Sequence, residues 1–456
     1  MSGKREVSRR EFIAGGVKNA AAMAAAGSVM GTARPGRVLG ANDRINMAVI
    51  GIRGRGMGHA MAWAGMENVE VTALCDVDEN LFDSRLKRIE DIQGTRPKAV
   101  VDMRDLFEDK EIDAVSIATT DHWHALSAIR ACQAGKHVYL EKPTCHNMWE
   151  GLKTIEAARK YDRIVEAGTQ NRSIRAVRAA MRFLHEGRLG DIYMAKGLCF
   201  KPRDSIGTAQ DSAVPEGVHY DLWLGPAPLR PFNPNRFHYN WHWHWDYGCG
   251  DIGNQGPHQM DIARWGLGKD EYPRKIKSVG GYFAFESDQE TPNTQLATYE
   301  YDDGKILQFE VRGLYTNRED DILIGNLFFG TEGWMHLNGN TWRTYYGRKN
   351  EPGPSSDDID MEKEEAADPM VLTGTGSGGH YANFISALRA NDHTLLTGDI
   401  LEGHRSSCLC HLGNISYRLG RELTFDSHAG KFVGDDVADT YLTRHYRAPY
   451  VVPETV

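Results

Sequence analysis

The sequence predicts a doubly wound α/β domain with a parallel sheet, followed by a second domain built on a mainly antiparallel sheet. In the first part, short apolar runs alternate strictly with helical stretches, which is the pattern of a parallel sheet covered on both faces. In the second part, longer extended stretches are separated by turn signals, which indicates antiparallel pairing. The length of 456 residues also exceeds one ordinary hydrophobic core, so we expect two domains.

The first domain is predicted to occupy residues 41–165. Its strands are expected at 46–50, 69–75, 114–118, 137–140 and 164–167. Helices are expected between them at 79–92, 125–134 and 148–161. Short apolar runs separated by longer amphipathic stretches are typical of buried parallel strands joined by crossover helices.

The second domain is predicted to occupy residues 166–456. Its extended stretches are expected at 275–286, 294–301, 306–312, 322–330 and 333–337. Asp302-Asp303-Gly304 and Asn338-Gly339-Asn340 are turn signals between them. The acidic segment 352–368 is expected to be a solvated loop, and helices are expected near the C-terminus at 381–389 and 401–419.

Residues 1–40 resemble an export signal and linker. Ser8-Arg9-Arg10-Glu11-Phe12-Ile13 is a twin-arginine pattern, and a mildly apolar, Ala/Gly-rich stretch follows it to Met30. The alternative is a disordered N-terminus that happens to contain two arginines. The seven cysteines are odd in number and irregularly spaced, so they do not indicate a disulfide framework. Both features suit a protein that folds in the reducing cytoplasm and is exported folded to the periplasm.

Composition excludes two classes of partner. The formal net charge is −9 and no basic stripe stands out, which disfavours nonspecific binding to nucleic acid. No run of about eighteen apolar residues is present, so no membrane contact is expected beyond export. The expected partner is therefore a small molecule.

A glycine-rich turn directly follows the first predicted strand and opens a helix. A dinucleotide-binding loop needs glycine where the chain turns sharply and where backbone N–H groups approach the pyrophosphate. Gly51, Gly54 and Gly56 are the glycines of this turn. The strict G-x-G-x-x-G template fails at its second glycine, which is Arg53, while Gly51 and Gly56 keep the first and third positions. Arg53 and Arg55 could each reach a phosphate.

The second predicted strand ends in Asp76. An acidic side chain at this position can accept hydrogen bonds from both hydroxyls of the adenosine ribose, and it would repel a 2′-phosphate. The sequence therefore predicts NAD rather than NADP as the cofactor. The alternative role for Asp76 is to cap the helix that follows.

The fifth predicted strand ends in Glu141-Lys142-Pro143. At the carboxyl edge of a parallel sheet, such residues face the ligand crevice. A lysine held beside a positive nicotinamide ring could take or return a hydroxyl proton as hydride moves. On its own, a Lys-Pro pair is also common in solvated turns.

These motifs resemble the glucose–fructose oxidoreductase/inositol dehydrogenase/MocA (Gfo/Idh/MocA) family. The glycine turn, Asp76, residues 118–124, residues 141–143 and residues 250–261 occur in that family's order over nearly the whole mature chain. The resemblance implies a Rossmann domain followed by an α/β domain with an open antiparallel sheet. That sheet would form one wall of the pocket and often the interface of a homodimer or homotetramer.

The resemblance also implies roles for single residues. Lys142 and His258 would be catalytic, and the peptide between Lys142 and Pro143 could be cis. Further cofactor contacts would come from Thr119, Thr120, His122, Trp123, His124 and Glu141. Asn171 and Arg172 follow the sixth strand and are predicted to contact cofactor and substrate, respectively. The alternative role for His258 is that of a buried structural histidine.

One position departs from the family pattern. Family dehydrogenases commonly carry an aspartate four residues before the catalytic histidine, where this chain has Asn254. One helical turn would place Asn254 and His258 on the same face, both near the substrate. An amide can orient an imidazole or a hydroxyl, but it cannot accept a proton as a carboxylate does. Proton handling would then rest on Lys142 and His258.

An aromatic, histidine-rich segment lies at residues 238–247. Aromatic rings stack on sugar faces, while histidine and aspartate hold hydroxyls, so His242, His244, Trp245 and Tyr247 are predicted to contact a carbohydrate. Two alternatives remain. His242 and His244 could bind a metal if they lie on a strand, although none is expected, and the aromatic residues could be structural.

Three functions remain open. The first is an NAD-dependent oxidoreductase acting on a sugar, glycoside or polyol, with oxidation at C3 as one option. The second is a glycosidase that uses NAD catalytically through oxidation, elimination, hydration and reduction. The third is a sugar-binding protein without activity. An exported enzyme has no replenished NAD pool, so its cofactor must stay bound. The Tyr-Pro-Thr-His segment associated with the glycosidase branch is absent, and this absence favours the first function over the second.

Overall fold

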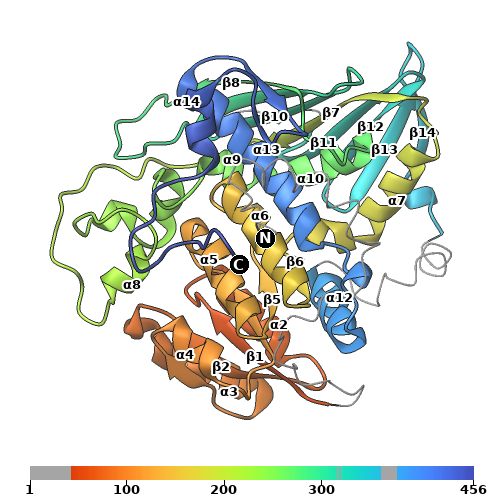
Figure 1. Ribbon diagram of the computed structural model, residues 1–456. Helices are drawn as coiled ribbons and strands as arrows, with labels where there is room; N and C mark the ends of the chain where they lie inside the picture. Colours follow the sequence, from red (N-terminus) through yellow and green to blue (C-terminus); the bar gives the residue numbers. More distant parts are fainter. Residues whose placement is uncertain (1–42, 316–317, 320, 361–376) are drawn as a thin grey trace, which may run out of the picture.

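The computed structural model describes residues 43–315, 318–319, 321–360 and 377–456. It confirms the predicted fold class, with a parallel sheet in the first domain and a larger, mainly antiparallel sheet in the second (Figure 1). The predicted export signal at residues 1–40 lies outside the described residues, as does the part of the acidic segment from residue 361 to 368. Within the described residues, no helix is both long and apolar enough to cross a membrane.

The first sheet has six parallel strands in the order β3-β2-β1-β4-β5-β6. The strands are β1 (Ile45–Ile50), β2 (Val69–Cys75), β3 (Lys98–Val100), β4 (Ala114–Ile117), β5 (His137–Leu140) and β6 (Val165–Ala167). The strand order reverses between β1 and β4, which both pair with parallel neighbours. Such a reversal opens a crevice at the carboxyl ends of the strands, where ligands bind in sheets of this kind.

Five helices connect these strands. They are α2 (Arg55–Ala64), α3 (Phe82–Gln93), α4 (Met103–Glu108), α5 (Asp121–Gln133) and α6 (Met148–Lys160). Helix α5 begins four residues earlier than the predicted 125–134, so most of the polar motif at 118–124 is helical. This shift places the first turn of α5 at the carboxyl edge of the sheet.

The second sheet has ten strands in the order β14-β13-β12-β11-β7-β10-β9-β8-β15-β16. The strands are β7 (Ile192–Cys199), β8 (Lys275–Gly281), β9 (Thr294–Glu300), β10 (Ile306–Arg312), β11 (Ile324–Gly330), β12 (Gly333–Asn338), β13 (Thr341–Tyr346), β14 (Glu351–Ser355), β15 (Leu423–Asp426) and β16 (Lys431–Phe432). The central pair β7–β10 is parallel, and the other pairs are antiparallel. The expected loop at 352–368 is wrong at its start, because residues 352–355 belong to strand β14, which pairs with β13. An edge strand tolerates the prolines of this segment.

The helices of the second half are α7 (Arg175–His185), α8 (Tyr220–Leu224), α9 (Gly250–Asn254), α10 (Gly256–Leu267), α12 (Ser377–Ala390), α13 (Ile400–Leu419) and α14 (Asp436–Asp439). Alternate residues of β9 and β10 are buried, including Tyr299, Leu307 and Phe309, and these share one core with α10 and α13. Helix α13 also contacts α6 and β6, so it joins the two domains (Figure 1).

Two late segments complete the core of the first domain. Tyr381, Phe384 and Leu388 of α12 share a core cluster with residues of β1, β2 and α2. The chain end, residues 444–456, is called here the C-terminal strap, and its Tyr450 and Val452 pack in a cluster with β4, α5 and α6. The boundary expected at residue 165 therefore does not divide the chain in space, and β6 itself runs to Ala167.

Polar contacts hold the C-terminal strap in place. The Arg444 guanidinium donates to Glu150 at 2.8 Å and to the His122 carbonyl at 2.7 Å. The Lys153 ammonium donates to the carbonyl of Glu454. These contacts fasten the strap across α5 and α6, whose N-terminal ends lie near the crevice.

Candidate active site

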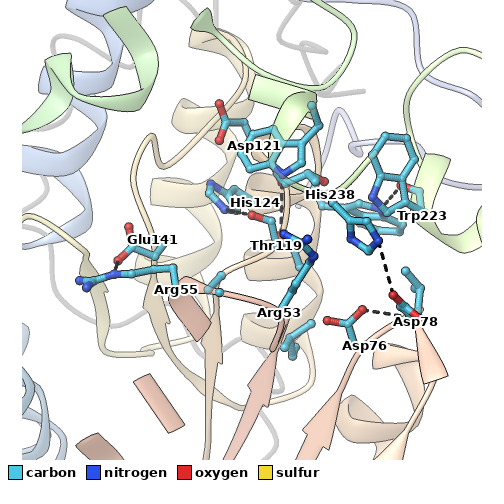
Figure 2. Close-up of a pocket in the computed structure, with 18 of the residues that line it drawn as sticks. Arg53, Arg55, Asp76, Asp78, Thr119, Asp121, His124, Glu141, Trp223 and His238 are labelled. Atoms are coloured by element: carbon cyan, nitrogen blue, oxygen red, sulfur yellow. Dashed lines mark hydrogen bonds and ion pairs between the residues drawn. The ribbon is translucent and has the colours of Figure 1, made fainter. Parts of the chain in front are cut away.

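The main cavity lies at the carboxyl edge of the first sheet and has a volume of about 340 Å³. Its walls are formed by the glycine turn, by the ends of β2, β4 and β5, and by the segment 222–242 (Figure 2). Of the predicted residues, it brings together Gly51, Arg53, Gly54, Arg55, Asp76, Thr119, Thr120, Trp123, His124, Glu141, Lys142, His242 and Asn254.

The tight packing of the glycine turn depends on two positions that lack a Cβ. Gly51 has φ +84°, and a Cβ there would lie 2.5 Å from the Ala118 carbonyl oxygen. A Cβ on Gly56 would lie 1.9 Å from the Gly51 carbonyl oxygen. Gly54 and Arg53 line the cavity beside the N-terminus of α2. Free N–H groups at a helix start bind phosphate, so the turn fits the pyrophosphate of a dinucleotide.

Arg55 lines the cavity, but its guanidinium pairs with a carboxylate of the protein. Its Nε donates to Glu141 Oε1 at 2.7 Å (Figure 2). His59 Nε2 lies 3.0 Å from the same oxygen, and the Gln170 amide donates to it at 3.2 Å. Burial works against ionisation of Glu141, but His59 and Arg55 outweigh it and hold the pKa of Glu141 well below its usual range. Glu141 is thus a fixed negative charge, and Arg55 neutralises it.

Asp76 occupies the position expected for the ribose contact. Its carboxylate accepts from the backbone N–H of Ile52 at 2.8 Å and of Asp78 at 3.1 Å. Burial raises the pKa of Asp76 to about 6 despite these hydrogen bonds. The following 3₁₀ turn is capped by Asp78, so capping by Asp76 is wrong as the alternative role. Asp76 therefore lines the cavity, where the prediction that it contacts the adenosine ribose of NAD requires it to be.

The polar motif after β4 contributes four of its five predicted contacts. Thr119, Thr120, Trp123 and His124 line the cavity, and His124 Nδ1 donates to the Pro143 carbonyl at 2.6 Å. The assignment of His122 to the cofactor is wrong. Its side chain is 0% exposed and Nε2 donates to the Trp223 carbonyl at 3.0 Å, because α5 turns this residue away from the cavity.

Lys142 extends from the end of β5 toward the second domain. Its Nζ donates to the main-chain carbonyl of Asn254 at 2.7 Å, and the Lys142–Pro143 peptide is cis as expected. The Asn254 side-chain amide donates instead to Asp251 at 3.4 Å. The Lys142 side chain therefore contacts only the main chain at position 254, and the Asn254 side chain plays no part in that contact.

The expectation that Asn254 and His258 share one helix face is wrong. Helix α9 ends at Asn254 and α10 starts at Gly256, with Pro257 in its first turn. Proline lacks an N–H group and favours a helix start, so the single helix is interrupted. As a result, Asn254 lines the main cavity, while His258 lines an adjoining one.

The adjoining second cavity has a volume of about 390 Å³ and shares Arg55 with the main cavity. Its polar lining consists of amides and one imidazole, from Gln170, Asn171, Gln255, His258, Gln259 and Asn326. Burial, helped by the positive charge of Lys142, lowers the pKa of His258 to about 3. Its Nδ1 is buried and has no hydrogen-bond partner in the described part of the chain. A neutral imidazole and several amides suit a ligand with hydroxyl groups.

Four predicted substrate contacts lie elsewhere. Arg172 is 8% exposed and makes a bidentate ion pair with Asp261, with bonds of 2.7 and 2.9 Å. It also pairs with Glu402 at 3.0 Å and lines neither cavity. Its assignment to substrate is wrong, because a guanidinium buried beside two carboxylates is already fully used.

The aromatic segment also divides between the cavity and the core. His242 lines the main cavity, but His244 is buried with Nε2 donating to the Asn235 carbonyl at 2.8 Å. The Trp245 side chain packs under Arg418, and Tyr247 is 0% exposed in an aromatic cluster. The assignments of these last three residues to substrate are wrong, because tertiary packing uses their side chains outside the cavity. The rings of His242 and His244 each contact a different main-chain carbonyl, that of Tyr239 and that of Asn235.

The segment 222–242 supplies cavity residues to which the sequence analysis assigned no contact. Trp223, His238, Tyr239 and Trp241 line the main cavity, and His238 Nε2 lies 3.7 Å from Asp78 (Figure 2). Backbone hydrogen bonds from His219 to Val77 and from Glu79 to Gly217 hold the residues just before this segment against the turn that follows β2. The 238–247 segment was a signal for such residues, but its periodicity did not show which side chains face inward.

Two family profiles match the chain. The one described as "Oxidoreductase family, NAD-binding Rossmann fold" matches residues 45–169, and "Oxidoreductase family, C-terminal alpha/beta domain" matches residues 202–320 and 376–452. Together they cover more than half of the 456 residues.

Curated relatives and solved structures agree with this assignment. A glycosyl hydrolase family 109 protein of Shewanella baltica (strain OS195) is 32% identical over 127 residues, and one of Shewanella pealeana is 31% identical over 144 residues. These matches cover 26% and 30% of this chain, and 27% and 30% of the relatives.

Two solved structures share the fold. Levoglucosan dehydrogenase in complex with NADH and levoglucosan has a TM-score of 0.63 at 18% identity, covering 84% of this chain and 99% of the other. WlbA dehydrogenase from Bordetella pertussis in complex with NADH and UDP-GlcNAcA has a TM-score of 0.61 at 20% identity, with the same coverage. The chain therefore belongs to the Gfo/Idh/MocA family of oxidoreductases, and its first domain is an NAD-binding Rossmann domain.

Proposed function

We propose that the protein moves a hydride between NAD and a CH–OH group of a sugar, a glycoside or a polyol. The observation that carries this proposal is the position of Lys142. Its side chain lines the same cavity as the glycine turn and Asp76, and it points to the second domain, where the adjoining cavity begins. An amine placed between cofactor and substrate sites can transfer the hydroxyl proton that accompanies hydride transfer.

The residues divide this work between the two cavities. Gly51, Gly56 and the N-terminus of α2 would hold the pyrophosphate, and Asp76 the adenosine ribose. Bound NAD supplies the hydride acceptor or donor. The Lys142 amine would take the hydroxyl proton during oxidation and return it during reduction. His258 stays neutral at physiological pH, so it would bind and orient a substrate hydroxyl rather than carry charge.

The second cavity supports a neutral, hydroxyl-rich substrate. Asn171, Gln255, Gln259 and Asn326 present amides there, and each amide can both donate and accept a hydrogen bond. The cation lining this cavity, Arg55, is paired with Glu141. A sugar or polyol would satisfy such a lining better than an acid would.

We further propose that NAD is tightly bound and that the protein is exported with it. The segment 222–242 forms one side of the main cavity, and the residues just before it are hydrogen-bonded to the turn after β2, which supports slow release of the cofactor. The twin-arginine pattern at Ser8–Ile13 supports periplasmic export of the folded protein. Fractionation of cells that express the full chain, or a variant with Arg9 and Arg10 changed to lysine, tests the export.

The test of the main proposal uses the purified protein and a panel of glycosides and polyols. Release of bound cofactor by denaturation should yield about one NAD(H) per chain. A substrate of the proposed class should reduce the bound NAD, which is read from the absorbance of reduced nicotinamide. Purified protein that holds no nicotinamide and binds none when it is added would contradict the proposal.

A second candidate function is a redox-neutral, NAD-dependent glycosidase. The match to glycosyl hydrolase family 109 proteins favours it, but that match spans about a quarter to a third of either chain. Release of free sugar without net reduction of bound NAD would support this candidate over the oxidoreductase. If the panel binds without either change, the protein is a sugar-binding protein instead.

The open sheet supports a proposal of a homodimer or homotetramer. Helices α7, α10 and α13 pack on one face of it. Phe329, Trp334 and Tyr345 stack on the other face, with ring centroids 6.4 and 4.6 Å apart. Their neighbours Phe328 and Met335 point into the helical core, so this aromatic row faces away from it. Light scattering of the wild type and of Trp334→Lys tests this assembly.

A further inference from the structure

Asp121 is a buried acid in the main cavity to which the proposed hydride transfer assigns no role. It is the first residue of α5, its side chain is 2% exposed, and it lines the same cavity as Lys142. Its Oδ2 atom is buried and finds no hydrogen-bond partner in the described part of the chain. Figure 2 shows Asp121 at the opposite end of this cavity from Asp76. A buried carboxylate oxygen without a partner calls for an explanation.

Three elements surround Asp121 with groups that set its charge. Lys142 at the end of β5, Cys249 just before α9 and His411 of α13 each favour the ionised form of Asp121. The thiols of Cys249 and Cys410 also face it. Burial raises the pKa of Asp121 to about 7, although Lys142, Cys249 and His411 all act in the other direction. Asp121 can therefore gain or lose a proton near neutral pH.

Position 254 of the second domain offers Lys142 no proton acceptor. At position 254 the Lys142 ammonium meets a main-chain carbonyl, and the side chain there is an amide. A carbonyl or an amide accepts a hydrogen bond but does not take up a proton at neutral pH. A proton that reaches Lys142 must leave through another group of the cavity.

The other carboxylates near this site are already committed. Glu141 is held ionised by Arg55 and His59, so it does not take up a proton near neutral pH. Asp251 makes a bidentate ion pair with Arg203, with bonds of 3.1 and 2.7 Å. Asp121 differs from both because one of its oxygens is unpaired and its protonation changes in the working range.

We propose that Asp121 is the carboxylate partner of Lys142 and serves from the first domain in place of the acid that position 254 lacks. The inference rests on the proposed function. During oxidation, the substrate C–H hydrogen leaves with both electrons to NAD, and the hydroxyl proton passes to the neutral Lys142 amine. The products are a carbonyl group, reduced cofactor and a lysine ammonium. The ammonium proton then passes to the Asp121 carboxylate, which restores the amine; reduction runs in the opposite direction. Asp121 thus acts through Lys142 as a positioning residue.

The first test needs no substrate. The purified protein is labelled with acetic anhydride at a series of pH values, and acetylation of Lys142 is measured by peptide mass spectrometry. In Asp121→Asn, loss of the neighbouring negative charge should move the half-labelling pH of Lys142 down by about one unit or more. The control is Asp113→Asn, a buried aspartate at the opposite end of β4 that accepts from the Asn46 N–H. It should leave the midpoint unchanged.

A second variant separates a charge effect from a structural one. Asp121→Glu keeps a carboxylate at position 121, so this conservative variant should retain a labelling midpoint close to that of the wild type. Unchanged NAD content in each variant shows that the fold is intact. A midpoint in Asp121→Asn within about 0.3 units of the wild type overturns the proposal, and so does a midpoint in Asp121→Glu as low as that in Asp121→Asn.

Turnover gives the second test once the glycoside panel has provided a substrate. The wild-type rate should fall on the acid side of about pH 7, near where Asp121 titrates. Asp121→Asn should lose at least about tenfold in kcat with little change in KM, and this acid limb should move. A change in KM alone overturns the proposal. If no panel member reacts, the proposed function fails while the labelling experiment still decides the role of Asp121.

Discussion

Two glycines in the same helix should respond in opposite ways to the same substitution. Gly56 stands in the first turn of α2, and a Cβ there would lie 1.9 Å from the Gly51 carbonyl oxygen. Carbon–oxygen contact needs about 3.5 Å, so one element must move by about 1.6 Å. Gly51 cannot retreat, because it already lies against Ala118 and has φ +84°. The N-terminus of α2 must therefore shift in Gly56→Ala.

The cost of this shift can be estimated from overpacking. Forcing an extra methyl group into a packed site costs about 1–3 kcal/mol. The same N–H groups would hold the pyrophosphate, so Gly56→Ala should lose about tenfold to a hundredfold in NAD affinity. Gly58→Ala is the matched control. Nothing lies within 4 Å of a Cβ at Gly58, so removing a helical glycine should stabilise the protein by about 0.5–1 kcal/mol.

Isothermal titration with NAD and thermal unfolding measure both effects. The cofactor must first be removed, and the same protocol applies to wild type, Gly56→Ala and Gly58→Ala. Gly56→Ala should show weaker binding and a lower Tm, whereas Gly58→Ala should bind NAD as the wild type does. Wild-type NAD affinity in Gly56→Ala would refute the argument that this turn cradles the cofactor.

Three further predictions concern catalysis, pH and the chain end. Lys142→Ala should lower kcat by at least about a hundredfold while NAD content stays unchanged, since its role is proton transfer; full activity measured with any panel substrate would exclude that role. Burial lowers the pKa of several histidines, so the unfolded chain binds more protons below about pH 6.5, and the folded state should lose stability as pH falls toward about 3. Buried His122, His137 and His258, each at about pKa 3, drive this trend, while the raised pKa values of Asp76 and Asp121 oppose it above pH 4; a constant Tm from pH 6.5 to 4 would contradict it. Deleting residues 448–456 removes three buried apolar side chains, each worth up to about 1.5–3 kcal/mol, so differential scanning calorimetry should show a Tm lower by several degrees, and an unchanged Tm would show that the strap adds nothing.

The sequence predicted the features that strand order controls. The carboxyl ends of parallel strands meet at one edge of a sheet, so Gly51, Asp76 and Lys142 could be placed together without knowing any side-chain contact. Strand β3 and strands β13 to β16 were missed because they are short or lie near sheet edges, where apolar patterns are weak. Strand β7 was also missed, although it has eight residues and lies in the middle of its sheet.

Side-chain direction within irregular segments was beyond the same reasoning. His242 and His244 have similar neighbours in the sequence, yet one faces the cavity and the other is buried against Asn235. The residue types of Arg172 and Tyr247 suit a sugar site equally well, but tertiary packing uses both for the core. Asp121 lies within the motif at residues 118–124, but the sequence did not predict that α5 begins at this residue.

The C-terminal strap has a consequence for how the chain is made. Tyr450, Val452 and α12 belong to hydrophobic clusters that residues 45–167 begin. During synthesis, the nucleotide-binding half would therefore emerge from the ribosome hundreds of residues before its last packing partners. A fragment ending near residue 169 should expose apolar surface and aggregate, and the nascent half should depend on chaperones until α12 and the strap have emerged.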